Sequence, residues 1–164
     1  MGRIAAMRRT LVIGLGNPLL RDDSVGLRVI AALKPRLEGR PDVELAEDYR
    51  GGLRLMERMI GFDRALVIDA ICSGAPPGTI HRLSPEAVPT QHSASPHDLN
   101  LPTALELGRQ AGALLPASAD ILIVAVEAVD VTTFGETLTP EVEAAVPLAV
   151  QAVLQALEGQ PASH

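Results

Sequence analysis

Two aspartates and a histidine lie where predicted strands and loops of this chain end. Asp69 follows the apolar run 65–68, Asp23 follows the loop after an earlier apolar run, and His97 ends a long polar segment. A carboxylate at the end of a buried strand costs several kcal/mol unless it is paired, protonated or bound to a metal. Oxygen and imidazole ligands without a thiolate suit nickel, zinc or iron. The three residues are therefore candidates for an incomplete metal shell with positions left open.

Each of these residues also has a simpler structural interpretation. Asp22, Asp23 and the serine after them are typical of a helix start, where they satisfy free amide groups. Asp69 could bind the amides of a following loop, and His97 could stand beside a cap formed by Ser95 or Asp98. The three candidates are far apart in sequence, so their spacing alone does not establish that they converge.

Other chemistries find less support in the sequence. The segment 14–19 lacks the third glycine of a dinucleotide fingerprint, and Pro18 removes an amide that a phosphate would need. Cys72 has no evident activating partner, and cysteine often packs as a small apolar side chain. No Gly-x-Ser-x-Gly motif is present, which disfavours a serine hydrolase. We expect His81 and His92 to be solvated.

Apolar runs alternate with segments of helical periodicity along most of the chain. Strands are predicted at 11–16, 43–46, 65–71, 79–83 and 121–126, and helices at 24–34, 53–60, 99–115 and 140–157, with Pro147 expected to kink the last helix. This alternation predicts a three-layer α/β/α sandwich with a twisted, mainly parallel sheet of about five strands. Ligands of such sheets gather at the carboxyl ends of the strands, which is where Asp69 lies.

The length of 164 residues fits one domain. We expect a short N-terminal extension at 1–9, a single α/β domain at 10–158 and a disordered tail at 159–164, with Met1 or Met7 as the true start. The polar segment 84–96 lacks periodicity, and a loop of that length is usually functional or mobile.

Charge and composition exclude several classes of protein. The net charge of −6 and the content of only one Tyr and two Phe disfavour nucleic-acid binding, which needs positive charge and stacking surfaces. No apolar run reaches the roughly 20 residues of a membrane helix, so membrane insertion is not expected. The single cysteine cannot form an internal disulfide and fits the reducing cytoplasm.

Taken together, the motifs of this chain resemble the hydrogenase maturation endopeptidases, which process the large subunit of nickel–iron hydrogenases. The resemblance extends from about residue 10 to residue 157. It rests on the segment 11–26 with its Gly-Leu-Gly-Asn-Pro and Asp-Asp-Ser-Val-Gly motifs, on Gly51-Gly52-Leu53, Val67-Ile68-Asp69-Ala70, Pro77-Gly78-Thr79-Ile80 and Ser95-Pro96-His97, and on the segment 134–142.

The resemblance implies a specific reaction. Such proteins are endopeptidases that remove a C-terminal extension from the large-subunit precursor after nickel has been inserted. The metal-contacting residues of the family correspond to Asp23, Asp69 and His97, and nickel belongs to the substrate precursor, with no organic cofactor. The first of these positions is often Glu in the family, so either Asp22 or Asp23 could be the ligand here. Asp23 and Asp69 are then the catalytic residues of an aspartic-type protease that activates water.

Two alternatives remain open at this stage. One is a non-catalytic nickel checkpoint or assembly chaperone that binds the large subunit without cutting it. The other is a hydrolase similar to peptidyl-tRNA hydrolase, whose opening motif resembles residues 14–18. That family has a histidine soon afterwards and a basic surface, whereas this chain continues with Arg21-Asp22-Asp23 and is acidic.

Overall fold

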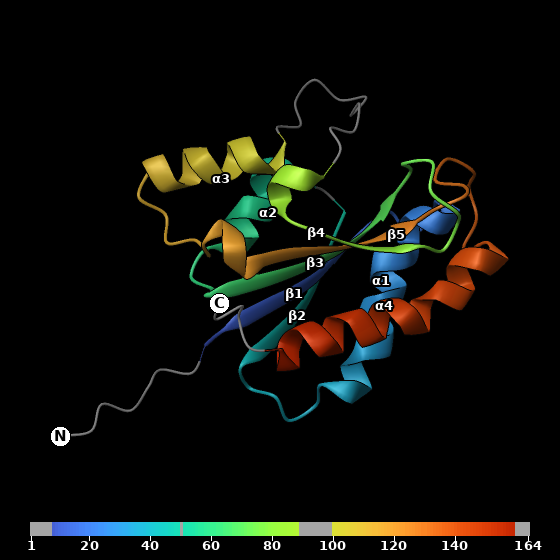
Figure 1. The fold of residues 1–164 in the computed structure, drawn as a ribbon, viewed down its shortest axis with the longest axis horizontal. Coiled ribbons are helices and arrows are strands. Elements are labelled where there is room, and N and C mark those ends of the chain that lie inside the picture. The colour runs from blue at the N-terminus through green and yellow to red at the C-terminus, as the bar shows by residue number, and fades with distance from the viewer. Residues whose placement is uncertain (1–7, 50, 89–99, 160–164) are drawn as a thin grey trace.

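The computed structural model describes residues 8–49, 51–88 and 100–159. Its sheet has five strands in the order β2-β1-β3-β5-β4. The strands are β1 (Thr10–Leu15), β2 (Val43–Asp48), β3 (Arg64–Ile71), β4 (Ile80–Leu83) and β5 (Ile121–Glu127). All neighbours pair in parallel except β4, which runs antiparallel to β5 at the edge. Because the sheet is mainly parallel, most of its strands have their carboxyl ends at the same end of the sheet (Figure 1).

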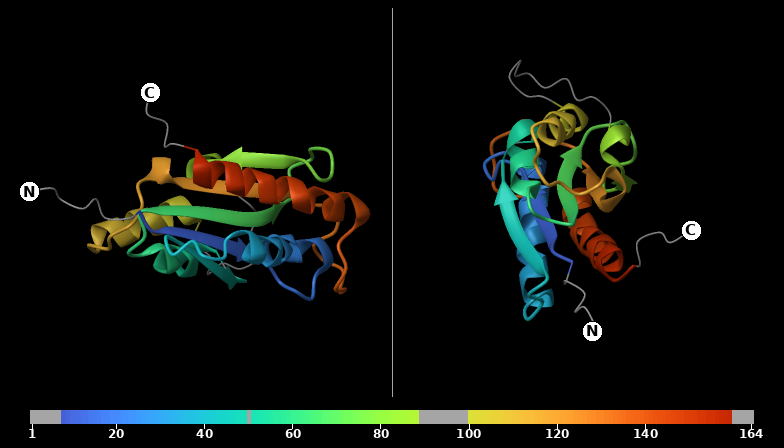
Figure 2. Two further views of the ribbon diagram at one scale, coloured as in Figure 1. Left: turned by 90° about the horizontal axis from the view of Figure 1, so that it is seen from below. Right: turned by 90° about the vertical axis from the view of Figure 1, so that its left-hand side faces the viewer.

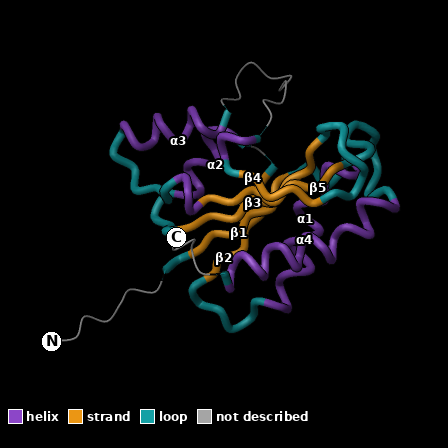
Figure 3. Tube along the Cα trace, viewed as in Figure 1, coloured by secondary structure: helices purple, strands orange, loops and turns teal. Residues whose placement is uncertain are grey.

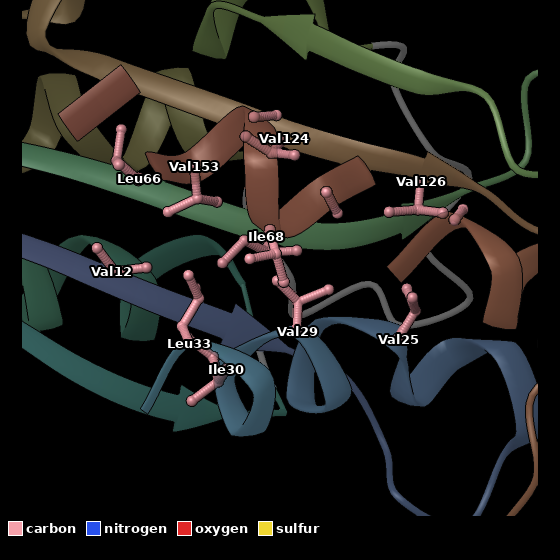
Figure 4. Close-up of a cluster of buried hydrophobic side chains, with 14 of the residues drawn as sticks. Val12, Val25, Val29, Ile30, Leu33, Leu66, Ile68, Val124, Val126 and Val153 are labelled. Atoms are coloured by element: carbon pink, nitrogen blue, oxygen red, sulfur yellow. The ribbon is translucent and has the colours of Figure 1, made fainter. Parts of the chain in front are cut away.

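Helices cover both faces of the sheet, which gives the three layers predicted from the sequence. The helices are α1 (Val25–Leu33), α2 (Gly52–Met59), α3 (Leu101–Gln110) and α4 (Pro140–Glu158). One apolar core joins α1 and α4 to the sheet (Figures 2 and 4), and a second core joins α2 and α3 to the opposite face. Among the described residues, no helix has both the length and the apolar character needed to cross a membrane.

The alternation of side chains along β3 fixes which face Asp69 occupies. Leu66 and Ile68 belong to the core under α1 and α4, whereas Val67 and Ile71 belong to the core under α2 and α3. Because successive side chains in a strand point to opposite faces, Asp69 lies on the α2/α3 face, near the carboxyl end of the strand.

Two glycines let the start of α1 approach the sheet closely. A Cβ added at Gly26 would lie 2.5 Å from the carbonyl oxygens of Leu15 and Ile68, and a Cβ at Gly14 would overlap the carbonyl oxygen of Gly26. No larger residue fits in this contact without displacing backbone atoms. The close approach brings the short 3₁₀ turn η1 (Arg21–Ser24) beside the end of β3.

The helices differ from the sequence expectation at two places. The segment expected to be helical from residue 24 begins instead with the η1 turn. The helix expected at 99–115 ends at Gln110, because Gly112 adopts a φ of 89° and its N–H and that of Ala113 return to carbonyls of the last turn. Helix α4 continues through Pro147, which is exposed; the kink expected there stays a prediction.

Candidate active site

The loops after β1, β3 and β5 gather at one end of the sheet (Figure 3), where the candidate residues of η1 and of the last part of β3 lie. Asp22 is completely buried there and anchors η1 to the loop after β5. Its Oδ2 accepts hydrogen bonds from the backbone N–H groups of Val129 and Asp130 at 2.9 and 3.0 Å and from the Thr139 hydroxyl at 2.8 Å, while Oδ1 accepts from the Thr139 N–H at 2.8 Å. Burial alone would raise the pKa of Asp22, but these bonds outweigh it and lower the pKa.

Asp23 has a different environment from its neighbour. Its side chain is half-buried, and its Oδ2 accepts one hydrogen bond, from the N–H of Asn17 at 2.8 Å. Burial raises the pKa of Asp23 despite this bond. Asp22 uses both of its oxygens to hold the fold, whereas Asp23 keeps lone pairs for a ligand. Of the two adjacent aspartates, only Asp23 has a carboxylate oxygen that accepts no hydrogen bond from the described residues.

Asp69 is the most strongly perturbed acid of this edge. Burial, with a further contribution from the negative charge of Asp23, raises the pKa of Asp69 to about 7, although its Oδ1 accepts a hydrogen bond of 2.8 Å from the N–H of Ala70. The two carboxylates are therefore close enough to interact electrostatically. No Lys, Arg or His of the described segments forms an ion pair with either one. Unpaired acids with raised pKa values are typical of functional sites.

The third predicted metal-contacting residue, His97, lies outside the described residues, as does His92. Within the parts of the chain that the structure describes, no group of three or more His, Cys, Asp or Glu side chains is arranged to hold a metal ion. The structure thus brings Asp23 and Asp69 together at one edge, and the position of the imidazole of His97 stays a prediction.

Another acid at this end of the sheet, Glu127, is buried and was missed by the sequence reasoning. It ends β5 and is 2% exposed, and it accepts hydrogen bonds from the N–H and hydroxyl of Ser73 at 2.8 and 2.6 Å. Its Oε1 also lies 3.0 Å from Nε2 of His81 on β4. His81 is therefore only partly solvated, because the edge strand aligns this imidazole with the end of β5. Glu127 has the same sequence feature as Asp69, since it is an acid at the end of an apolar run, and this feature could have identified it.

Cys72 follows β3 and is exposed, unlike the buried cysteine that its residue type suggests. Partial desolvation and the negative charges of Glu127, Asp22 and Asp23 raise the pKa of its thiol. The thiolate is the reactive form of cysteine, so this environment disfavours a nucleophilic role for Cys72.

The similarity of this chain to known proteins extends over almost the whole domain. Residues 27–156 match the profile of the family HycI, described as hydrogenase maturation protease. The chain belongs to the hydrogenase maturation protease family. It is 36% identical over 152 residues to the hydrogenase 2 maturation protease of Escherichia coli, a match that covers 91% of this chain and 90% of that protein.

Further relatives agree with this assignment. The hydrogenase expression/formation protein HupD of Thiocapsa roseopersicina is 29% identical over 147 residues, and the match covers 90% of this chain but 66% of the length of that relative. The solved structure of the hydrogenase maturating endopeptidase HybD from E. coli superimposes with a TM-score of 0.76 at 34% identity, with 91% of each chain covered. This member of the hydrogenase maturation protease family is therefore an enzyme of the protease class with the family's α/β fold.

Proposed function

We propose that this protease removes the C-terminal extension from the precursor of a nickel–iron hydrogenase large subunit after nickel insertion, and that it recognises the bound nickel through Asp23, Asp69 and His97. Nickel is then part of the substrate, and the protein needs no cofactor of its own. With its single cysteine, the enzyme suits the reducing cytoplasm, where we place the reaction.

The observation that carries this proposal is the pair of unpaired carboxylates at the carboxyl edge of the sheet. Two desolvated acids that repel each other are unfavourable in the free protein. A cation brought by the substrate relieves both the burial cost and the repulsion. The raised pKa values of Asp23 and Asp69 therefore favour a substrate that brings a cation to this position, as the nickel of a loaded precursor would.

The same two acids can also promote peptide hydrolysis. In the metal-free protein the pKa of Asp69 is about 7, and a cation beside it would favour the ionised carboxylate, the form that can take a proton from water at neutral pH. Contact between these acids and the substrate metal would fix the scissile peptide bond relative to that base. A metal ion can further polarise a carbonyl or water next to it. Recognition and chemistry then depend on the same side chains, so the enzyme acts only on a loaded precursor.

Intact-mass spectrometry of the large-subunit precursor from the same organism tests this function directly. The precursor is incubated with the protease in its nickel-loaded and its nickel-free form. We expect loss of one discrete C-terminal peptide from the loaded form only, and no loss when Asp69→Asn replaces the wild-type enzyme. A stable complex with unchanged precursor mass would support the checkpoint function instead. Cleavage of both forms at equal rates would refute recognition through nickel.

A further inference from the structure

Strand pairing places His81 in one row with Asp69 across the sheet. Asp69 of β3 lies opposite Ala125 of β5, and Ala125 lies opposite His81 of β4. Directly paired residues project to the same face of a sheet, and Ala125 belongs to the core on the α2/α3 face. The carboxylate and the imidazole therefore lie on the same side, about 10 Å apart at their Cα atoms given the usual strand spacing.

The residue between them is small. The side chain of Ala125 is a single methyl group, so the side chains of Asp69 and His81 extend further from the sheet than the residue between them. Asp69 is half-buried and the side chain of His81 is 23% exposed, so both can be reached from outside. Ala125 itself is buried in the core, so a substrate peptide bond would have to lie beside the partly exposed ends of the two side chains, with the acid on one side and the imidazole on the other.

Glu127 fixes the protonation pattern of His81. The hydrogen bonds from Ser73 and His81 outweigh the effect of burial and lower the pKa of Glu127, so its carboxylate is ionised and acts as an acceptor. Nε2 of His81, 3.0 Å away, must then carry the hydrogen. In the described part of the chain, Nδ1 of His81 has no hydrogen-bond partner, which leaves this second ring nitrogen for another group.

Glu127 also ties this imidazole to the loop that follows Asp69. Its carboxylate binds the N–H and hydroxyl of Ser73, and its backbone exchanges hydrogen bonds of 2.8 Å with Gly78 and Thr79. These contacts hold the end of β3, the start of β4 and the end of β5 in one unit. His81 is therefore held in a fixed place relative to Asp69.

We propose that His81 is a catalytic residue of this protease whose imidazolium form, with a hydrogen on each ring nitrogen, donates its Nδ1 proton to the leaving nitrogen, and that Glu127 is its positioning residue. This inference rests on the proposed function. A carboxylate of the Asp23/Asp69 pair takes a proton from water as the water oxygen bonds to the scissile carbonyl carbon. The C–N bond then breaks, its electron pair goes to nitrogen, and that nitrogen receives the proton of Nδ1. Proton exchange with solvent resets both groups, so one water is consumed for each carboxylate and amine formed.

The substitution His81→Gln separates catalysis from structure. The glutamine amide can occupy the place of Nε2 and keep the hydrogen bond to Glu127, but it offers no group to replace Nδ1. We expect single-turnover cleavage of the nickel-loaded precursor to fall at least about 100-fold, the usual effect of losing a general acid, with precursor affinity and melting temperature unchanged. His81→Ala should regain part of its rate when imidazole is added, which a purely structural role would not allow.

Arg82→Gln is the matched control, because Arg82 is the next residue of β4, is exposed, and donates to Gln155 of α4 on the opposite face. It should cleave at the wild-type rate. Wild-type cleavage by His81→Gln, or a lost rate in His81→Ala that imidazole does not restore, would overturn the catalytic role. Failure of the wild-type enzyme to cleave would instead refute the proposed function itself, so the two failures are distinguishable.

Discussion

The same substitution at the adjacent residues Asp22 and Asp23 should destabilise the fold at the first position and leave it almost unchanged at the second. In Asp22→Asn, the remaining oxygen can keep the three donors now bound to Oδ2, but the new NH₂ group faces the N–H of Thr139. A buried donor without an acceptor costs about 1–3 kcal/mol, and loss of charge from the other bonds adds about 1 kcal/mol. We expect the free energy of unfolding to fall by about 2–4 kcal/mol, which corresponds to about 5–15 °C in Tm for a domain of this size.

Asp23→Asn should leave stability almost unchanged. The asparagine oxygen can still accept the N–H of Asn17, which is the one hydrogen bond that Asp23 receives. Removal of a carboxylate whose pKa is raised by burial also removes an unfavourable charge. We expect a change of less than about 0.5 kcal/mol, as for substitutions that break no buried contact, together with loss of precursor cleavage.

Urea unfolding followed by circular dichroism measures the stability of both variants, since the chain has no Trp and one Tyr. The pH dependence adds a second check. Because the pKa of Asp22 in the folded protein lies below its ordinary value of 3.8, its stabilisation is complete above about pH 4 and is lost as the pH falls through the lower folded value. The gap between wild type and Asp22→Asn should therefore narrow in acid. If Asp22→Asn is as stable as wild type at pH 7 but cannot cleave, the assignment of the two residues is refuted.

Three further outcomes follow from the site and its supports. Asp69→Asn should be more stable than wild type at pH 8 by about 2 kcal/mol after allowance for partial solvation. Because the pKa of Asp69 in the folded protein is about 7, the stability of the wild type should decline as the pH rises from about 4 to 7. Identical urea unfolding curves of the wild type at pH 5 and pH 8 would contradict this prediction. Gly26→Ala should cost more than about 3 kcal/mol, whereas Gly51→Ala, with open space around it, should unfold at the wild-type urea midpoint. Cys72→Ser should cleave the precursor normally, and iodoacetamide should modify the wild-type thiol slowly at pH 7.5; loss of cleavage would reinstate a nucleophilic cysteine.

The sequence by itself determined the architecture of this protein. Buried parallel strands need continuous apolar runs, and amphipathic helices need a period near 3.6, so both kinds of element can be recognised locally. The apolar run that forms β3 also identified Asp69 as a candidate functional residue, because no neighbouring residue in the sequence could compensate a negative charge at the end of a buried strand. The predicted layers, and the family to which the chain belongs, followed from these local patterns.

Only the tertiary structure decided what each polar residue does. Asp22 and Asp23 are indistinguishable in sequence, and they differ because the donors that satisfy Asp22 come from Val129, Asp130 and Thr139, 107 to 117 residues away. The contact between Glu127 and His81 likewise requires an antiparallel edge strand in one register. Hydrogen bonds across such distances depend on how strands and loops pack, and local periodicity carries no information about that packing. The fold could therefore be predicted from single segments of the sequence, whereas the different roles of the acidic residues could not.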